Sequence, residues 1–254
     1  MVRMIKATLR RTMSRYPDLF RPIWSVIYPL YNRRTIDEGL AYSDRSSAFS
    51  DIFRDNRWGS AESVSGTGST LAHSLPLRKR LPKLLAELQV TSFLDAPCGD
   101  HHWISTLEFP KQMTYVGGDI VPELIARNET RHGASNKQFR HLDIVADDLP
   151  DCDLWLCRHV LFHLSNDDII KVFENFARSN IKYILMEDHT FVNNNNDIRS
   201  GGFRLVNVRA HPFFLPKPTR RVPDSVPPEA PGYLGLWTRD QVAKALADRR
   251  ELQV

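Results

Sequence analysis

Residues 92–103 read SFLDAPCGDHHW, and the rest of the chain is arranged around them. Its apolar start indicates a short buried strand, which Asp95 ends with a carboxylate. The small residues 96–99 predict a tight turn, and Asp100 is a typical N-cap for a helix over 101–107. A strand, a small-residue turn and a helix form the half-unit that binds nucleotide-like ligands in doubly wound sheets, because backbone N–H groups there can approach a ligand closely.

The turn by itself does not distinguish a ligand site from an ordinary strand-to-helix connection. One glycine, Gly99, stands where a dinucleotide fingerprint has three, and no Walker lysine follows. A nicotinamide dehydrogenase is therefore disfavoured.

Strand-like and helix-like segments alternate after residue 92. The strand-like segments are 92–95, 113–118, 138–142, 153–158 and 181–187, and the helix-like segments are 101–107, 121–130 and 166–179. This alternation predicts an α/β fold with a doubly wound, mostly parallel sheet and helices on both faces.

The flanks of this region also carry structural signals. Residues 71–89 predict a helix with breaks at Pro76 and Pro82, and 238–250 predict a last helix capped by Thr238. A final antiparallel hairpin is either abbreviated or built from two segments that alternate like strands, 203–208 and 233–237.

Length and composition indicate a globular protein. The 254 residues give room for one α/β domain with a small addition, and 42% hydrophobic and 25% charged residues are ordinary values.

Cys98, Cys152 and Cys157 form no CxxC pair, which argues against a disulfide frame or zinc site and for a reducing compartment. No run approaches the roughly 18 apolar residues of a membrane span. We expect a cytoplasmic protein.

The first 54 residues are expected to form a helical basic lead-in to a domain over 55–254. Residues 1–34 contain seven arginines and Lys6 but a single acid, Asp18. Three interpretations stay open: an amphipathic helix on an anionic membrane surface, an organelle targeting segment, or a helix packed on the domain. Charges elsewhere are too mixed to predict a nucleic-acid face.

A Ser/Gly-rich run, WGSAESVSGTGST, extends from Trp58 to Thr70. Such runs are often flexible linkers. The tryptophan, Glu62 and the Gly-x-Gly-Ser pattern instead favour an ordered binding loop.

Charged residues stand at or just past the ends of successive strand-like segments, where ligands bind in open α/β sheets. Asp119 follows Asp95 by 24 residues, close to the interval of about 20 at which an acid holds ribose hydroxyls in this architecture. Alternatively, Asp119 caps the helix begun by Pro122. Asp143 could accept a hydrogen bond from an adenine amino group or stabilise a turn.

Together these stretches resemble the successive motifs of class I S-adenosylmethionine-dependent methyltransferases. The resemblance covers roughly residues 55–240 and rests on 95–99, Asp119, Asp143 with LP at 149–150, and DLWLCRHVLFHLS at 153–165. WGSAESVSGTGSTL, LDAPCGD and LFHLS resemble one subgroup, whose members are often tied to sugar or cell-surface glycan modification. His159 departs from this subgroup's R-D-x-L-F-H-L pattern, which has Asp there.

The resemblance implies a Rossmann-like domain that uses S-adenosyl-L-methionine. The turn 95–100 would face its methionine part, Asp119 its ribose, and Asp143 with Ile144 its adenine, while 58–66 would close over it. Arg78 and Arg158 are candidates for its carboxylate. The full set of expected cofactor residues is Trp58, Gly59, Ser63, Ser65, Gly66, Arg78, Asp95, Ala96, Cys98, Gly99, Asp100, Asp119, Ile120, Asp143, Ile144 and Arg158.

We expect the activity to be O-methylation of a small acceptor, most plausibly a sugar or glycan unit. A neutral hydroxyl is a poor nucleophile without a base, and His163 in LFHLS is the candidate. His163 could otherwise be a helix-entry residue that bonds Asp167 or the backbone, and His159 is the second candidate base.

The acceptor pocket is expected from an insertion over about 190–236. Candidate substrate-binding residues are Glu187, Asp188, His189, Arg204 and Asn207. A metal site made from His159, His163, Asp188 and His189 is conceivable, but the spacing fixes no ligand geometry and we expect none. Two alternatives remain: N- or phosphate-O-methylation without a base, and a non-catalytic binding module.

Overall fold

The computed structural model describes residue 23, residues 44–226 and residues 232–251. The expected helix or membrane contact over 1–34 therefore lies outside the described residues, apart from residue 23. Within the described part, no helix has the length and apolar character to cross a bilayer.

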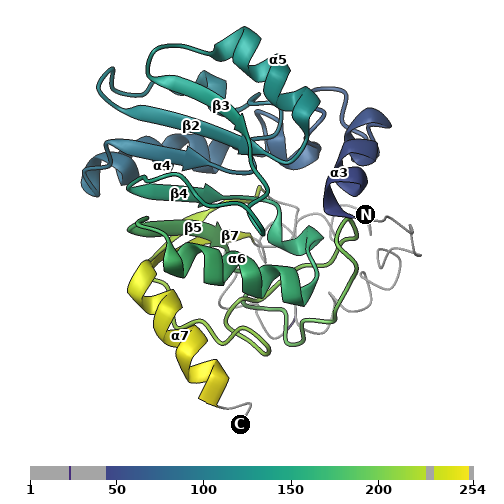
Figure 1. Cartoon of the computed structure of the whole chain (residues 1–254), viewed down its shortest axis with the longest axis vertical. Coiled ribbons are helices and arrows are strands. Elements are labelled where there is room, and N and C mark those ends of the chain that lie inside the picture. Colours follow the sequence, from purple (N-terminus) through teal and green to yellow (C-terminus); the bar gives the residue numbers. More distant parts are fainter. Residues whose placement is uncertain (1–22, 24–43, 227–231, 252–254) are drawn as a thin grey trace, which may run out of the picture.

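A seven-stranded sheet forms the centre of the molecule, in the order β3-β2-β1-β4-β5-β7-β6 (Figure 1). The strands are β1 (Ser92–Asp95), β2 (Thr114–Asp119), β3 (Lys137–His141), β4 (Leu154–Cys157), β5 (Tyr183–Glu187), β6 (Arg220–Pro223) and β7 (Tyr233–Thr238). The first five are parallel, and β7 runs antiparallel to both β5 and β6. The predicted doubly wound, mostly parallel sheet is confirmed.

Strand β1 pairs with β2 on one side and with β4 on the other, so the strand order reverses at β1. Ligands bind at such a switch point, beyond the carboxyl ends of the strands. Every residue of β4 is buried, which explains its continuous apolar sequence LWLC.

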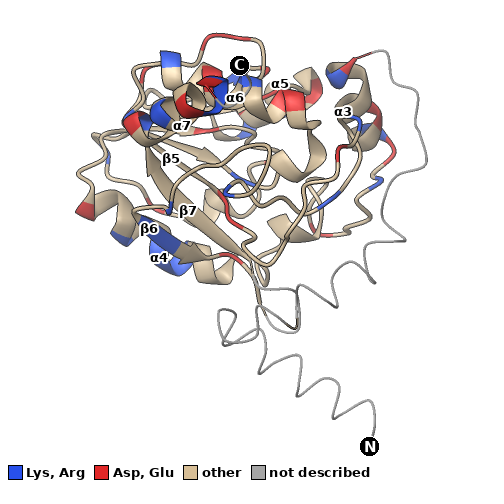
Figure 2. Cartoon of the chain, turned by 90° about the horizontal axis from the view of Figure 1, so that it is seen from below, with Lys and Arg blue, Asp and Glu red and all other residues tan. Residues whose placement is uncertain are grey.

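Helices cover both faces of the sheet. They are α3 (Arg45–Arg54), α4 (Leu75–Glu87), α5 (Pro122–His132), α6 (Asn166–Arg178) and α7 (Arg239–Glu251). Apolar residues of α6 and α7 pack in one core with Trp155 and Trp237, and those of α4 pack in a second core with Phe93 and Leu156. Lys and Arg residues occur together on α4 and the neighbouring β6, whereas both signs of charge are mixed over α6 and α7 (Figure 2).

The helix predicted over 101–107 is wrong. The chain makes turns after Asp100 and only a short 3-10 helix at Ile104–Thr106. His101 has φ of +56°, a left-handed conformation that a right-handed helix cannot contain. The Asp100 carboxylate instead binds a loop earlier in the chain, as described below.

Three further expectations concern the flanks. Pro82 does not break α4, because leucines on both sides of it are buried in the core and offset the missing backbone hydrogen bond. Residues 203–208 are not a strand, and the hairpin consists of β6 and β7. Thr238 does cap α7: its Oγ1 accepts from Gln241 N at 3.2 Å, while Gln241 Oε1 accepts from Thr238 N at 3.0 Å.

Candidate functional site

A cavity opens beyond the carboxyl ends of β1, β2 and β4. Its empty volume is about 900 Å³, part of it open to solvent. Residues named from the sequence that line it are Trp58, Ser65, Asp95, Cys98, Gly99, Asp119, Ile120, Asp143, Ile144, Arg158, His159 and His163. The structure thus brings together most of the expected cofactor residues.

The turn after β1 is built around Gly99. Its N–H donates to Asp119 Oδ2 at 2.9 Å, and Asp119 Oδ1 accepts from Val121 N at 3.0 Å. Gly99 has φ of +54°, and a Cβ there would lie 2.2 Å from Ser65 Oγ. Only glycine therefore allows this close approach of turn and loop.

Two buried carboxylates face the cavity. Burial raises the pKa of Asp95 to about 7, although a hydrogen bond from Tyr115 opposes the shift. Burial also raises the pKa of Asp119 to about 6, against the hydrogen bonds that it accepts from Val121 and Gly99. Both carboxylates become easier to ionise when a cation or a hydrogen-bond donor enters the cavity.

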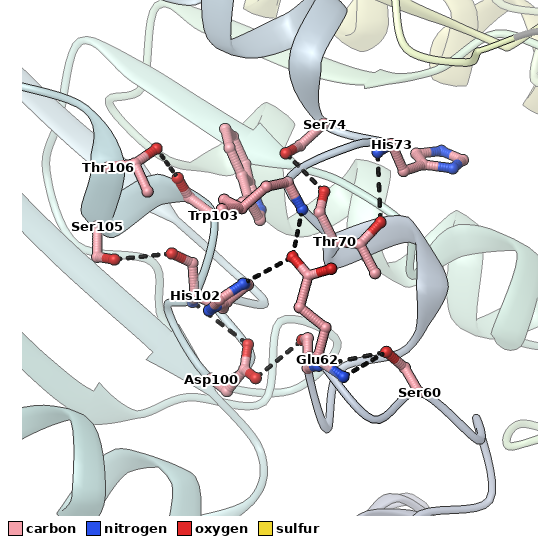
Figure 3. Close-up of polar contacts among 12 residues, drawn as sticks. Ser60, Glu62, Thr70, His73, Ser74, Asp100, His102, Trp103, Ser105 and Thr106 are labelled. Atoms are coloured by element: carbon pink, nitrogen blue, oxygen red, sulfur yellow. Dashed lines mark hydrogen bonds and ion pairs between the residues drawn. The ribbon is translucent and has the colours of Figure 1, made fainter.

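The loop 58–70 is tied to the turn after β1 by two acids (Figure 3). Asp100 accepts from Ser63 Oγ at 2.8 Å, Val64 N at 3.1 Å and Ser65 Oγ at 3.2 Å. Glu62 Oε1 accepts from the N–H of residue 71 at 2.6 Å and lies 3.0 Å from His102 Nε2. These contacts hold the loop against one wall of the cavity.

Helix α3 (Arg45–Arg54) forms another wall of the cavity, a role that the sequence did not indicate. Phe49 and Phe53 line the cavity, and Arg45 lies 2.7 Å from Asp143 Oδ2 and 3.2 Å from Asp168 Oδ1. Asp143 Oδ1 also accepts from a main-chain N–H two residues on, at 3.0 Å. Asp143 thus stabilises a turn, the second of its two expected roles, and it borders the cavity as well.

A second hollow joins the first through shared lining residues, Trp58, Ser65, His159 and His163. It is also lined by Gly66, Gly68, His73, Phe162, His189, Phe203, Leu205 and Asp224, and its empty volume is about 1080 Å³, including open solvent. A ligand in one hollow would therefore meet a ligand in the other beside the two histidines proposed as bases.

His163 has its tautomer set by the backbone. Its Nδ1 lies 2.7 Å from Gly202 O, and because a carbonyl only accepts, Nδ1 carries the proton and Nε2 has the lone pair. Burial lowers the pKa of His163 to about 4, with the Gly202 hydrogen bond opposing the shift. The ring is neutral at pH 7 and able to accept a proton.

His159 is held by an acid that the sequence did not single out. Asp224 Oδ2 lies 3.1 Å from His159 Nε2, and both Asp224 oxygens accept from Arg158, at 2.8 and 2.9 Å. Burial opposes ionisation of Asp224, but its electrostatic interactions and hydrogen bonds with Arg158 and His159 together outweigh burial and lower the pKa. Burial, together with the Arg158 charge, lowers the pKa of His159 to about 3.

Arg158 also donates to Gly68 O at 2.9 Å. Its Nε and Nη2 are thus engaged within the protein, whereas the side chain lines the first cavity. A Cβ at Gly68 would lie 2.2 Å from His159 Nδ1, so the loop 58–70 fits closely against His159.

Several expected cofactor residues line neither hollow. Arg78 donates to the main-chain oxygen of residue 71 at 2.8 Å, outside both hollows. Ala96 accepts through its main-chain oxygen from the Trp155 indole at 2.8 Å. Gly59 shapes the start of the loop with φ of +66°, while Ser63 and Asp100 bind each other within the loop contact.

Most of the expected substrate residues are engaged internally. Glu187 accepts from Val160 N at 2.9 Å, and Asp188 pairs with Arg221 at 3.0 Å. Arg204 donates to Leu161 O at 3.0 Å, and Asn207 donates to the main-chain oxygen of residue 192 at 2.8 Å. Of these candidates, His189 lines the second hollow. Within the described ranges, no group of three His, Cys, Asp or Glu residues is arranged to hold a metal ion.

No protein-family model and no curated protein matches the sequence. Solved structures do match. The N-methyltransferase NodS from Bradyrhizobium japonicum WM9, in complex with S-adenosyl-L-homocysteine (SAH), is 14% identical with a TM-score of 0.54, over 77% of this chain and 98% of NodS. PigF with SAH is 13% identical with a TM-score of 0.52, over 88% of this chain and 72% of PigF. The likeness concerns the fold, and it confirms the predicted Rossmann-like methyltransferase sheet.

Proposed function

We propose that this chain is an S-adenosyl-L-methionine-dependent methyltransferase that methylates a hydroxyl group of a small acceptor, such as a sugar unit. The observation that carries the proposal is the junction of the two hollows. A cavity with acids at the ends of β1 and β2 meets a second hollow at His163, whose Nε2 is unprotonated.

The first cavity fits the cofactor chemically. Asp119 sits at the end of β2, and each of its oxygens keeps a lone pair for a ribose hydroxyl beyond the backbone bond that it already accepts. Asp95 would pair with the ammonium group, whose positive charge would offset the burial that raises the pKa of this carboxyl. Apolar side chains of α3 and Ile144 offer a surface for adenine. Arg158 remains the candidate for the carboxylate.

The bound cofactor would supply a methyl group on a sulfonium, which needs no further activation by the protein. The protein's task is to align the acceptor and remove its proton. The cofactor would give up its methyl group to the acceptor oxygen and leave as a neutral thioether, and His163 Nε2 would take up the proton of the acceptor hydroxyl, so that the net charge is conserved.

Calorimetry with SAH tests the cofactor part of this proposal. Wild-type protein should bind SAH saturably, and Asp119→Ala should bind at least about tenfold more weakly, because hydrogen bonds to a charged group are lost. Glu174→Ala, a surface change on α6, is the control. Folded wild-type protein that shows no heat with SAH would refute the proposal. Mass spectrometry with isotope-labelled cofactor and a glycoside panel then tests the transfer.

A further inference from the structure

Three imidazole rings of the second hollow each use one nitrogen inside the protein. Nδ1 of His163 and Nδ1 of His189 lie 2.7 and 3.2 Å from main-chain carbonyl oxygens, and Nε2 of His159 lies 3.1 Å from a carboxylate oxygen of Asp224. Because these oxygens only accept, each of the three nitrogens carries its ring's proton. The other nitrogens, Nε2 of His163, Nε2 of His189 and Nδ1 of His159, are lone-pair acceptors.

Each of these three acceptor nitrogens keeps some solvent exposure, and that of His159 lies beside Gly68 of the loop 58–70. Among the described residues, none of them has a hydrogen-bond partner and none is sealed from solvent, in contrast to Nε2 of His101. Each of the three rings lies beside the ring of Phe162, with centroid separations of 4.6 Å for His163, 5.4 Å for His159 and 6.3 Å for His189. They therefore serve one hollow, which all three line.

The electrostatics of this hollow disfavour anionic ligands. Burial lowers the pKa of His159 to about 3 and the pKa values of His163 and His189 to about 4, so all three rings are neutral at pH 7. Asp224 has its charge balanced by Arg158 at 2.8 Å. Neutral lone-pair acceptors match O–H donors, and they offer nothing to a phosphate or a carboxylate.

We infer that the acceptor is a neutral polyol that donates one hydroxyl to each of these three nitrogens. The reacting hydroxyl meets His163, and two further hydroxyls meet His159 and His189, which act as specificity residues. Phe203 and Leu205 in the same hollow suit the C–H face of a pyranose ring. This inference rests on the proposed methyl transfer and narrows its substrate class to compact molecules with several free hydroxyl groups.

Long-range ¹H–¹⁵N NMR of the imidazole rings tests the inference without turnover. Methyl α-D-glucopyranoside, -galactopyranoside and -mannopyranoside are added to the full chain, with and without SAH, and cyclohexanol is the single-hydroxyl control. The unprotonated nitrogens of His159, His163 and His189 should shift saturably with at least one pyranoside and not with cyclohexanol. Equal shifts with cyclohexanol, shifts with cyclohexylamine alone, or no shift with any pyranoside would overturn the inference.

Two variants of His189 test its role as a specificity residue. His189→Leu should weaken pyranoside binding roughly 3- to 10-fold, the value of one hydrogen bond. His189→Asn should recover most of the loss, because its amide can donate to the Val206 carbonyl and its oxygen can accept from the ligand. SAH calorimetry separates the two proposals: bound SAH without pyranoside shifts refutes this inference alone, and pyranoside shifts without bound SAH refute the cofactor assignment.

Discussion

The phenol of Tyr115 donates a hydrogen bond of 2.7 Å to Asp95 Oδ2. On its other side, His101 Nδ1 lies 3.1 Å from the same phenol oxygen, and since the phenol proton goes to Asp95, His101 donates to Tyr115. Asp95 lines the first cavity, whereas neither supporting side chain does. Two residues behind the cavity thus influence the charge of a carboxylate within it.

Tyr115→Phe should shift the pH dependence of cofactor binding. Burial raises the pKa of Asp95 to about 7, and the Tyr115 hydrogen bond opposes this, so the variant's pKa should be higher still. If ionised Asp95 binds the cofactor's ammonium group, SAH affinity falls as the pH drops through about 7. Calorimetry between pH 5.5 and 9 should place this fall about one unit higher in the variant. If the pH dependence of SAH affinity is the same in both proteins, the charge of Asp95 does not contribute to binding.

The same raised pKa has a consequence for stability. Since folding raises the pKa of Asp95 above its unfolded value, the folded state holds the proton more tightly. This contribution is complete at acid pH below the unfolded pKa and is lost as the pH rises through about 7. The melting temperature of the ligand-free protein should therefore carry a declining term between pH 4 and 8, and Asp95→Asn should remove it.

His163→Ala should leave SAH affinity unchanged and lower turnover about 100-fold or more, the usual range for loss of a general base. Because the pKa of His163 is lowered to about 4, the wild-type rate at saturating substrates should stay flat from pH 8 to near pH 5. His211→Ala, at an exposed histidine, is the control. Normal turnover in His163→Ala would instead favour an acceptor that needs no base.

The sheet could be predicted because each strand can be recognised from its own short segment of sequence. Strands β1, β2, β4 and β5 are short, largely apolar segments that stop at a polar residue, and each lies within about two residues of its predicted bounds. The acids at the strand ends followed from the same pattern. The topology then placed them at one edge, as the carboxyl ends of parallel strands require.

The errors occur where a distant partner decides the local structure. Asp100 is a good N-cap by type, but its carboxylate binds Ser63 and Ser65, some 35 residues earlier in the chain. Asp224 lies in a proline-rich stretch, and its importance comes from Arg158, 66 residues away. No motif or spacing in the sequence pointed to Arg45. Such contacts exist only once the fold has formed.

Asp224→Asn should destabilise the protein strongly. Arg158 would stay buried with its charge unpaired, and breaking a buried pair in this way costs about 3–5 kcal/mol. Urea denaturation measures the free energy of unfolding, and a joint replacement of Asp224 and Arg158 by leucine should cost less than Asp224→Asn alone. Since folding lowers the pKa of Asp224, the pair stabilises above the unfolded pKa and the effect fades as the pH falls below it. Equal losses in both variants would mean that packing, and not charge, dominates here.

Asp100→Ala should release the loop 58–70 from the cofactor cavity. The carboxylate accepts from Ser63, Val64 and Ser65, at 2.8 to 3.2 Å, and its removal leaves the loop fewer polar contacts, chiefly those of Glu62, of Arg158 with the Gly68 oxygen and of the main-chain N–H of residue 100 with Ser65. Amide hydrogen exchange over 60–70 should accelerate about tenfold or more, and SAH should bind more weakly, because the wall has to be ordered on binding. Exchange in α6 should not change, and Glu174→Ala should alter neither quantity. If the loop exchanges at the wild-type rate in Asp100→Ala, packing of Trp58 holds the loop 58–70 in place, and the Asp100 carboxylate is not needed to hold it.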